Sequence, residues 1–257
     1  MENYPQFLAH LRKAMRNEYL AVNRKLNPVS VNLPTTTPDQ LIHIIQQYTL
    51  FPKQIVSFLR IAQEAAAKHN WQEIQDELQR NIGEEQGSQT EGIPHYDMLV
   101  KGISEELGPD LGYAPMADLE NRLRFLDASP TMDMFLNRMP EIVGNTDPAY
   151  AIGAAYALES SAVPELVIVR SAVEKAISII TCSPMVRSGY LGKFFDAHLK
   201  IWEPGHEEGL RRTSEAYITT SESQIGFEKG FRDTMKAMDS MWIGLYNESQ
   251  NLISSDS

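Results

Sequence analysis

The chain has 257 residues, of which 42% are hydrophobic and 22% charged, a composition typical of a globular protein with a sizeable core. Its net charge of -11, without any Lys- or Arg-rich run, argues against nucleic acid as a partner, because such binding needs basic surface. We see no apolar run approaching the roughly 20 residues of a membrane span, and no signal peptide is expected in residues 1–10. The single cysteine, Cys182, excludes an intramolecular disulfide and favours a reducing, cytoplasmic setting.

Apolar residues recur at helical spacing along most of the chain, and Pro and Gly separate the segments. Residues 3–25 are predicted to form an amphipathic helix, and 26–37 an extended connector. Thr37 is the expected N-cap of the next helix, which runs from Pro38 to a break at residues 51–52. The remaining helices are predicted over 53–69, 71–86, 94–107, 117–127, 130–142, 148–178, 187–217 and 221–247. We therefore expect a single helical domain over 1–257, with 1–36 as its N-terminal helix and connector and 250–257 as a frayed tail.

Two of the six histidines lie in one predicted helix together with a carboxylate: His198, Glu203 and His206. These are ligand types of zinc and iron sites, and Glu203 and His206 share a helix face at i, i+3, as in di-iron bundles. On an ideal helix, however, His198 and His206 would point about 80° apart. Because Pro204 removes a backbone donor, we predict a π-bulge or local break between Lys200 and Gly205 that brings the two histidines together.

A second candidate pair flanks a turn-rich break over residues 87–94. If this break reverses the chain, Glu85 and His95 can meet one metal ion. Glu91, four residues before His95, is a rival partner. Acidic residues near helix ends are usually solvated, and we expect both Glu84 and Glu91 to be so.

Glu159 is a lone carboxylate in the small, apolar run over residues 149–164. Buried charge is costly unless it is paired or bound to a metal, so a metal-binding or other functional role is predicted. The alternative is a buried partner for an arginine, and Arg170 lies close to the same line of the helix. Arg170 is a candidate for binding a substrate carboxylate, although a simple pair with a nearby acid is the favoured interpretation.

Other chemistries lack their motifs. There is no P-loop, dinucleotide-binding glycine pattern or GxSxG, and the HExxH motif of zinc proteases is incomplete after His206. His10, His43 and His69 lack partners at ligand spacing beyond single acidic neighbours, which indicates surface contacts.

Taken in order, the candidate ligands resemble those of the haem-oxygenase-like di-metal oxidases, and the chain is most similar to their CADD-like branch. The ligands are Glu85, His95, Glu159, His198, Glu203 and His206. Residues 81–87 ahead of His95 resemble the first ligand helix of that family, and Leu158-Glu159 followed by Pro164 resembles the middle one. The family usually shows His-x3-Asp-x2-His in its last ligand helix, whereas this chain has His-x4-Glu-x2-His. The predicted bulge would absorb the extra residue.

The resemblance implies an all-α, haem-oxygenase-like bundle of about seven core helices plus short extra helices. It also implies a non-haem di-iron enzyme, with two Fe(II) ions and O2 as co-substrate, that oxidises a small amine, amino acid or fatty-acid-like molecule. Tyr156, Trp202 and Arg170 are the candidates for contacting this substrate. A homodimer and an unidentified electron donor are compatible with the family, and no membrane partner is expected.

Two alternatives remain open. The first is a metal-free bundle of the same fold that binds ligands or partners, or acts as a cofactorless enzyme. The second, a ferritin-like bundle, would need two Glu-x-x-His pairs, and only Glu203 with His206 is convincing.

Overall fold

The computed structural model describes residues 3–113 and 117–252, and within these ranges the secondary structure is helical, without strands. The elements are α1 (Tyr4–Glu18), α2 (Pro28–Asn32), α3 (Pro38–Tyr48), α4 (Leu50–Lys68), α5 (Gln72–Glu85), α6 (His95–Leu107), α7 (Ala117–Arg124), α8 (Pro130–Val143), α9 (Pro148–Ile180), α10 (Tyr190–Ala197), the π-helical turn η1 (His198–Trp202), α11 (Glu203–Ser214) and α12 (Ser221–Asn251). The predicted all-α class is confirmed.

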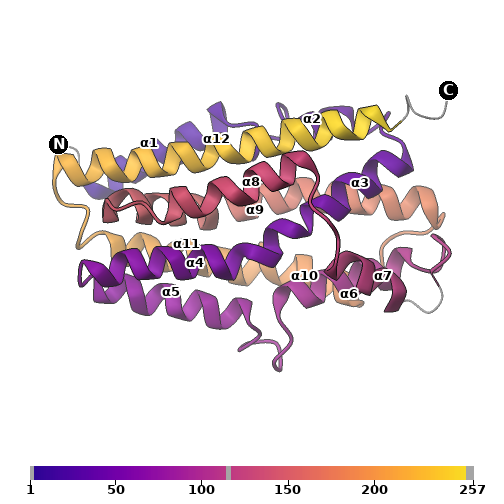
Figure 1. Cartoon of the computed structure of the whole chain (residues 1–257), viewed down its shortest axis with the longest axis horizontal. Coiled ribbons are helices and arrows are strands. Elements are labelled where there is room, and N and C mark those ends of the chain that lie inside the picture. The colour runs from indigo at the N-terminus through magenta and orange to yellow at the C-terminus, as the bar shows by residue number, and fades with distance from the viewer. Residues whose placement is uncertain (1–2, 114–116, 253–257) are drawn as a thin grey trace.

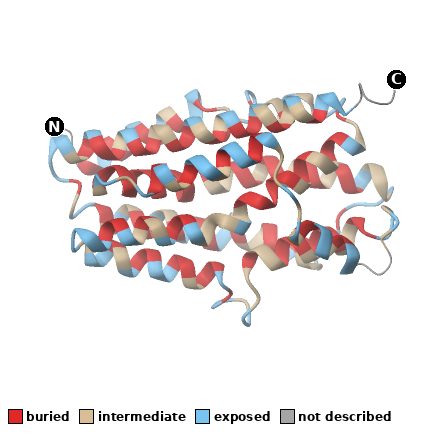
Figure 2. Cartoon of the chain, in the orientation of Figure 1, coloured by how far each residue is buried: buried red, intermediate tan, exposed pale blue. Residues whose placement is uncertain are grey.

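Helix α9 is the central element of the bundle. It packs against α12, α11, α3, α4 and α8, and the long helices run roughly side by side along the molecule (Figure 1). Buried residues occur along the whole of α9, whereas the outer helices bury one face and expose the other (Figure 2). A side chain on α9 can therefore face the interior in nearly any direction, which makes this helix a natural carrier of buried functional groups.

By length and composition alone, α9 could cross a membrane, which qualifies the expectation that no apolar run approaches such a length. Its most apolar window is 78% buried among the other helices. This burial is that of a core helix, and the hydropathy of α9 is explained by the neighbours that surround it.

The helix starts follow the expected capping chemistry. Thr37 accepts a hydrogen bond from the backbone of Gln40 and completes a capping box, as predicted for the start of α3. Asp147 caps α9 by accepting from the backbone N–H of Ala149, with Pro148 in the first turn.

Three expectations about local structure differ from the observed fold. Helix α1 ends at Glu18, well before residue 25. Just after this end, the backbone N–H of Ala21 donates to Asp239 on α12 at 2.8 Å. The predicted extended connector contains the short helix α2, because Asn27 accepts from the N–H groups of Val29 and Ser30. Helix α12 continues to Asn251, and the rest of the predicted frayed tail, residues 253–257, lies outside the described residues.

Two glycines allow α9 and α12 to approach each other closely. A Cβ atom at Gly153 would overlap the backbone of Phe227, and one at Gly230 would overlap the backbone of Tyr150. The two helices therefore touch backbone to backbone in the first third of each helix, about one and a half turns before Glu159.

We expect Gly153→Ala to lower the free energy of unfolding by about 1–3 kcal/mol, because the added methyl group must push the helices apart. The shift is measured as the midpoint of urea unfolding. Gly205→Ala is the matched control, since a Cβ there meets nothing within 4 Å. An unchanged midpoint for Gly153→Ala would contradict the close packing.

Candidate metal centre

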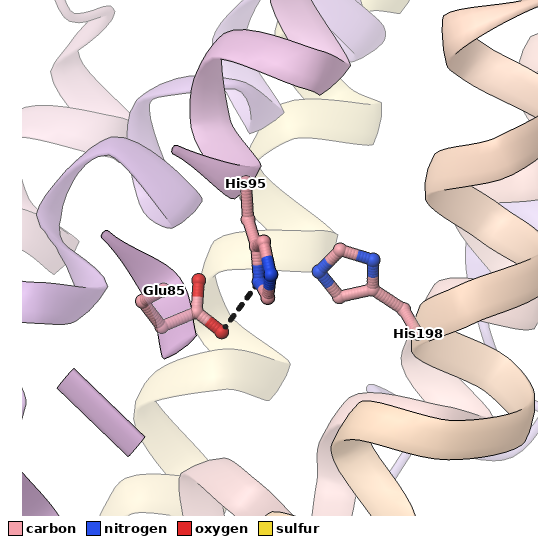
Figure 3. A group of neighbouring side chains, drawn as sticks. All are labelled: Glu85, His95 and His198. Carbon is pink, nitrogen blue, oxygen red and sulfur yellow. Dashed lines mark ion pairs between the residues drawn. The ribbon is translucent and has the colours of Figure 1, made fainter. Parts of the chain in front are cut away.

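The loop between α5 and α6 brings two predicted ligands together. Helix α5 ends at Glu85, α6 begins at His95, and Gly87 lies between them with a positive φ of 98°. A Cβ at Gly87 would collide with the backbone of Gly92, so this tight reversal needs glycine. As a result, Nδ1 of His95 lies 3.1 Å from Oε1 of Glu85 (Figure 3).

The predicted helix over 187–217 is interrupted by the π-helical turn η1, in which the N–H of Glu203 bonds to the carbonyl of His198, five residues earlier. A helical distortion was predicted between Lys200 and Gly205; the observed one starts two residues earlier and ends at Trp202. Pro204 accounts for this distortion, because it has no N–H to donate to the carbonyls of the preceding turn. The inserted residue rotates His198 toward the face that carries Glu203.

The ring of His198 is held in a defined orientation. Its Nδ1 hydrogen-bonds to the carbonyl of Phe194 at 2.7 Å, which leaves Nε2 as the nitrogen available to a ligand. Figure 3 shows this ring facing His95, with 4.6 Å between the ring centroids. Trp202 stacks on His95 at 4.0 Å and also contacts the His198 ring edge to face at 4.7 Å, so the three rings pack against one another.

The six predicted ligands come together in the bundle, and all are buried. They include two groups that could each hold a metal ion: Glu85 with His95 and His198, and Glu85 with Glu203 and His206. Within each group the ligand atoms lie within 4.8 Å of one another, and Glu85 is common to both groups. Glu159 completes the set, because its Oε2 lies 3.3 Å from Nδ1 of His206 while Oε1 accepts from Asn81.

The nitrogen and oxygen atoms of this centre are arranged to bind a metal rather than to hydrogen-bond with one another. Both ring nitrogens of His95 and Nδ1 of His206 are buried without a hydrogen-bond partner, although carboxylate oxygens lie close by. Buried polar atoms in folded proteins are nearly always paired. Unpaired imidazole nitrogens that face carboxylates are the arrangement expected of ligands around a divalent cation.

Burial and neighbouring charges shift the ligands in different directions. Burial lowers the pKa of His198 to about 3, against the attraction of Glu85, so its imidazole is neutral at pH 7. Burial alone would also lower the pKa of His206, but Glu159, Glu203 and Glu84 outweigh it and raise that pKa. Burial raises the pKa of Glu203 to about 7, in opposition to His206. Metal binding would therefore release protons from this group.

One residue beside this centre was not predicted from the sequence. Glu84 was expected to be solvated, yet it is buried, and its Oε2 lies 3.0 Å from Nε2 of His206. Its burial results from packing against α11, which no local pattern indicates. Glu91, the other rival, is exposed as expected.

A cavity adjoins the centre and is lined on one side by Glu85, His95, Glu159, His198 and Glu203. Its other walls are formed mainly by apolar side chains, namely Phe51, Pro52, Ile55, Leu158, Ala162, Leu166 and Phe194, together with Tyr48 and Glu165. Glu165 accepts from Nε1 of Trp242 at 2.8 Å and also hydrogen-bonds with Tyr48. The sequence could have indicated Glu165, because it is also a lone carboxylate in an apolar run of α9.

The three candidate substrate-binding residues lie outside the described lining of this cavity. Arg170 pairs with Glu174 at 2.8 Å and Asp196 at 3.3 Å, which is the favoured alternative of a simple pair. The hydroxyl of Tyr156 lies between Arg12 and Glu207, and Trp202 supports His95. Their contact with a substrate stays a prediction that this geometry does not favour.

An all-α bundle with a buried carboxylate–histidine centre is compatible with the predicted haem-oxygenase-like class, and comparisons with known proteins support that fold. The family described as "Domain of Unknown Function with solved-structure structure (DUF3865)" matches residues 6–248. The chain therefore belongs to the DUF3865 family. The comparison with curated proteins finds no match.

Solved structures confirm the fold and the CADD-like resemblance. A crystal structure of a CADD-like protein of unknown function from Nostoc punctiforme PCC 73102 is 30% identical with a TM-score of 0.83, and the match covers 99% of this chain and 97% of that one. A second crystal structure of the CADD-like protein from that organism gives a TM-score of 0.82, with 30% identity and coverages of 96% and 98%. A domain of unknown function with a heme oxygenase-like fold, from Shewanella denitrificans OS217, has a TM-score of 0.65 at 14% identity over 98% and 94% of the two chains. This last likeness concerns the fold alone.

Glu165 generates a pH-dependent prediction. Burial raises its pKa to about 8, so the folded chain keeps a proton that the unfolded chain releases at lower pH. The free energy of unfolding therefore falls as pH rises from about 4.5 to about 8. Glu165→Gln stays neutral at every pH and should remove this contribution. The difference in free energy of unfolding between this variant and the unmodified chain should therefore shift by about 3 kcal/mol in favour of the variant between pH 5 and pH 8.

The measurement is urea unfolding of the metal-free chain across this pH range. Glu64→Gln, at an exposed position of α4, is the control and should leave the profile unchanged. Parallel profiles for Glu165→Gln and the unmodified chain would show that Glu165 is ionised in the fold.

Proposed function

We propose that this protein is a non-haem di-iron oxidase or oxygenase that uses O2 to oxidise a small molecule held in the cavity. The observation that carries the proposal is the pair of buried histidine–carboxylate groups that share Glu85. The CADD-like relatives are themselves of unknown function, so they support the fold of the site and leave its chemistry to be tested.

The ligand residues have separate roles in this proposal. Two Fe(II) ions bound here would supply the electrons and open coordination positions that activate O2. His95, His198 and His206 would hold the metals, and Glu85, which belongs to both candidate groups, would contribute to both. Glu159 and Glu203 stand beside His206, where a carboxylate can hold the metal or move aside to open a position.

The cavity restricts the class of substrate. Among its described lining residues there is no lysine or arginine, and Phe51, Ile55 and Leu166 supply apolar surface. A substrate with an apolar body fits these walls, whether it is an amine, an amino acid or a fatty-acid-like molecule. A carboxylate group on the substrate would find its positive partner only at the metals, whereas an amino group could face Glu165.

Partners follow from the same proposal. The enzyme works in the cytoplasm, alone or as a homodimer, on a small molecule and without nucleic acid or membrane. An external donor delivers the electrons that each turnover consumes.

The proposal is tested by loading the full chain anaerobically with Fe(II) and counting the metal bound. About two iron ions per chain are expected, followed by a transient visible absorbance when O2 is admitted. His198→Ala removes one terminal ligand and should weaken metal binding about tenfold or more. His69→Ala, an exposed histidine at the end of α4, is the matched control and should behave like the unmodified chain.

If the unmodified chain binds no metal and His198→Ala changes nothing, the di-iron proposal is wrong. The metal-free bundle, acting as a ligand-binding protein or cofactorless enzyme, would then be the supported alternative.

A further inference from the structure

Glu84 is a buried carboxylate that belongs to neither candidate metal group. It lies at the end of α5, directly before Glu85, and only 5% of its surface is exposed. Its Oε2 lies 3.0 Å from Nε2 of His206, in hydrogen-bonding geometry. A carboxylate at this depth requires an explanation, because burial of an unpaired charge is costly.

The two nitrogens of the His206 ring have different surroundings. Nε2 makes the hydrogen bond to Glu84, whereas Nδ1 has none. Nδ1 instead faces three carboxylate oxygens, at 3.3 Å from Glu159, 3.6 Å from Glu203 and 4.0 Å from Glu85. An imidazole that binds a metal through one nitrogen keeps its proton on the other. The surroundings of the ring therefore make Nδ1 the ligand atom and Nε2–H the donor to Glu84.

Glu84 is itself held in place from the side away from His206. Arg80, one turn earlier on α5, donates to Oε1 of Glu84 and also to Glu77. The same guanidinium reaches the carbonyl of Gly205 at 3.3 Å, which connects α5 to the first turn of α11. Gly209 makes room for this contact, because a Cβ there would overlap the carboxylate of Glu77.

We propose that Glu84 is a positioning residue that orients His206 for metal binding, by accepting the Nε2–H proton so that Nδ1 faces Glu85, Glu159 and Glu203. Arg80 keeps the Glu84 carboxylate in the orientation that this contact needs. The inference rests on the proposed di-metal function and adds to it. Glu84 then raises the metal affinity of the position built from Glu85, Glu203 and His206. It does not affect the position built from Glu85, His95 and His198.

The test uses the full chain and compares Glu84→Ala and Glu84→Gln with the unmodified protein. Each is titrated anaerobically with Fe(II) against a competing chelator, so that two dissociation constants are resolved. The event that His198→Ala weakens identifies the position of His95 and His198. Glu84→Ala should weaken the other event about 10- to 100-fold and leave this one within about twofold. Glu84→Gln keeps an acceptor but loses the charge, so an intermediate loss is expected.

A second measurement reports on the ring itself. The chain is loaded with Zn(II), a diamagnetic probe, and the nitrogen chemical shifts of His206 are recorded by NMR. The unmodified chain should show a metal-bound Nδ1 and a protonated Nε2. Glu84→Ala should lose the protected Nε2–H signal. Glu91→Gln changes an exposed glutamate in the following loop and is the matched control, with no expected effect on either measurement.

The outcomes separate the two proposals. If the unmodified chain binds two metals and Glu84→Ala changes neither constant, or weakens both equally, the role of Glu84 is wrong while the di-iron function stands. A metal-bound Nε2 in the Zn(II)-loaded chain would also overturn it. If the unmodified chain binds no metal, the proposed function fails, and this inference fails with it. Glu84→Gln, close in shape to the original, serves if Glu84→Ala does not fold.

Discussion

The contact between buried carboxylates and buried imidazoles is the interaction on which the rest of this structure depends. Glu85, Glu159 and Glu203 lie in the interior, and within the described part of the chain their ion pairs are with His95 and His206. Arg80 forms its ion pairs with Glu77 and Glu84 instead. Such a cluster is costly in a low-dielectric interior unless cations neutralise it. Each of the two candidate groups could hold a divalent cation, which would neutralise these charges.

Close packing elsewhere in the bundle offsets the free energy lost by burying these carboxylates. Helix α9 carries Glu159 through the centre, and the glycines at 153 and 230 bring α12 against it at backbone distance. The π-helical turn then places His198 and Glu203 at the same centre from one continuous stretch of chain. Helical distortion of this kind weakens local hydrogen bonding, and its presence beside the ligands fits the common use of π-bulges at functional sites.

Local chemistry made much of the fold predictable. Thr37 with Pro38 and Asp147 with Pro148 start helices because a capping side chain and a preset φ act within a few residues. The early end of α1 was not predictable in this way, since it involves a hydrogen bond from Ala21 to Asp239, 218 residues away. Tertiary contacts of this kind override helical periodicity.

The site shows the same division between local and tertiary information. Glu159 stands out in the sequence because its neighbours are small and apolar, and spacing drew attention to Glu203 and His206. Glu84 carries no such mark, because its burial depends on α11 packing over α5. Sequence contrast finds a charged residue whose own segment is buried, and it misses one that a distant segment covers.

Two glutamates on α9 line the same cavity but have different partners. Glu159 and Glu165 are six residues apart, which turns them about 120° from each other on an ideal helix. Glu159 meets Asn81 and His206, whereas Glu165 meets the neutral donors Trp242 and Tyr48, and burial raises its pKa to about 8. The cavity lining therefore includes the carboxylates of the candidate metal groups and one acid, Glu165, that burial favours in its protonated form. With metals bound as proposed, a molecule in this cavity would turn its most negative group toward the metals and a hydrogen-bond donor toward Glu165.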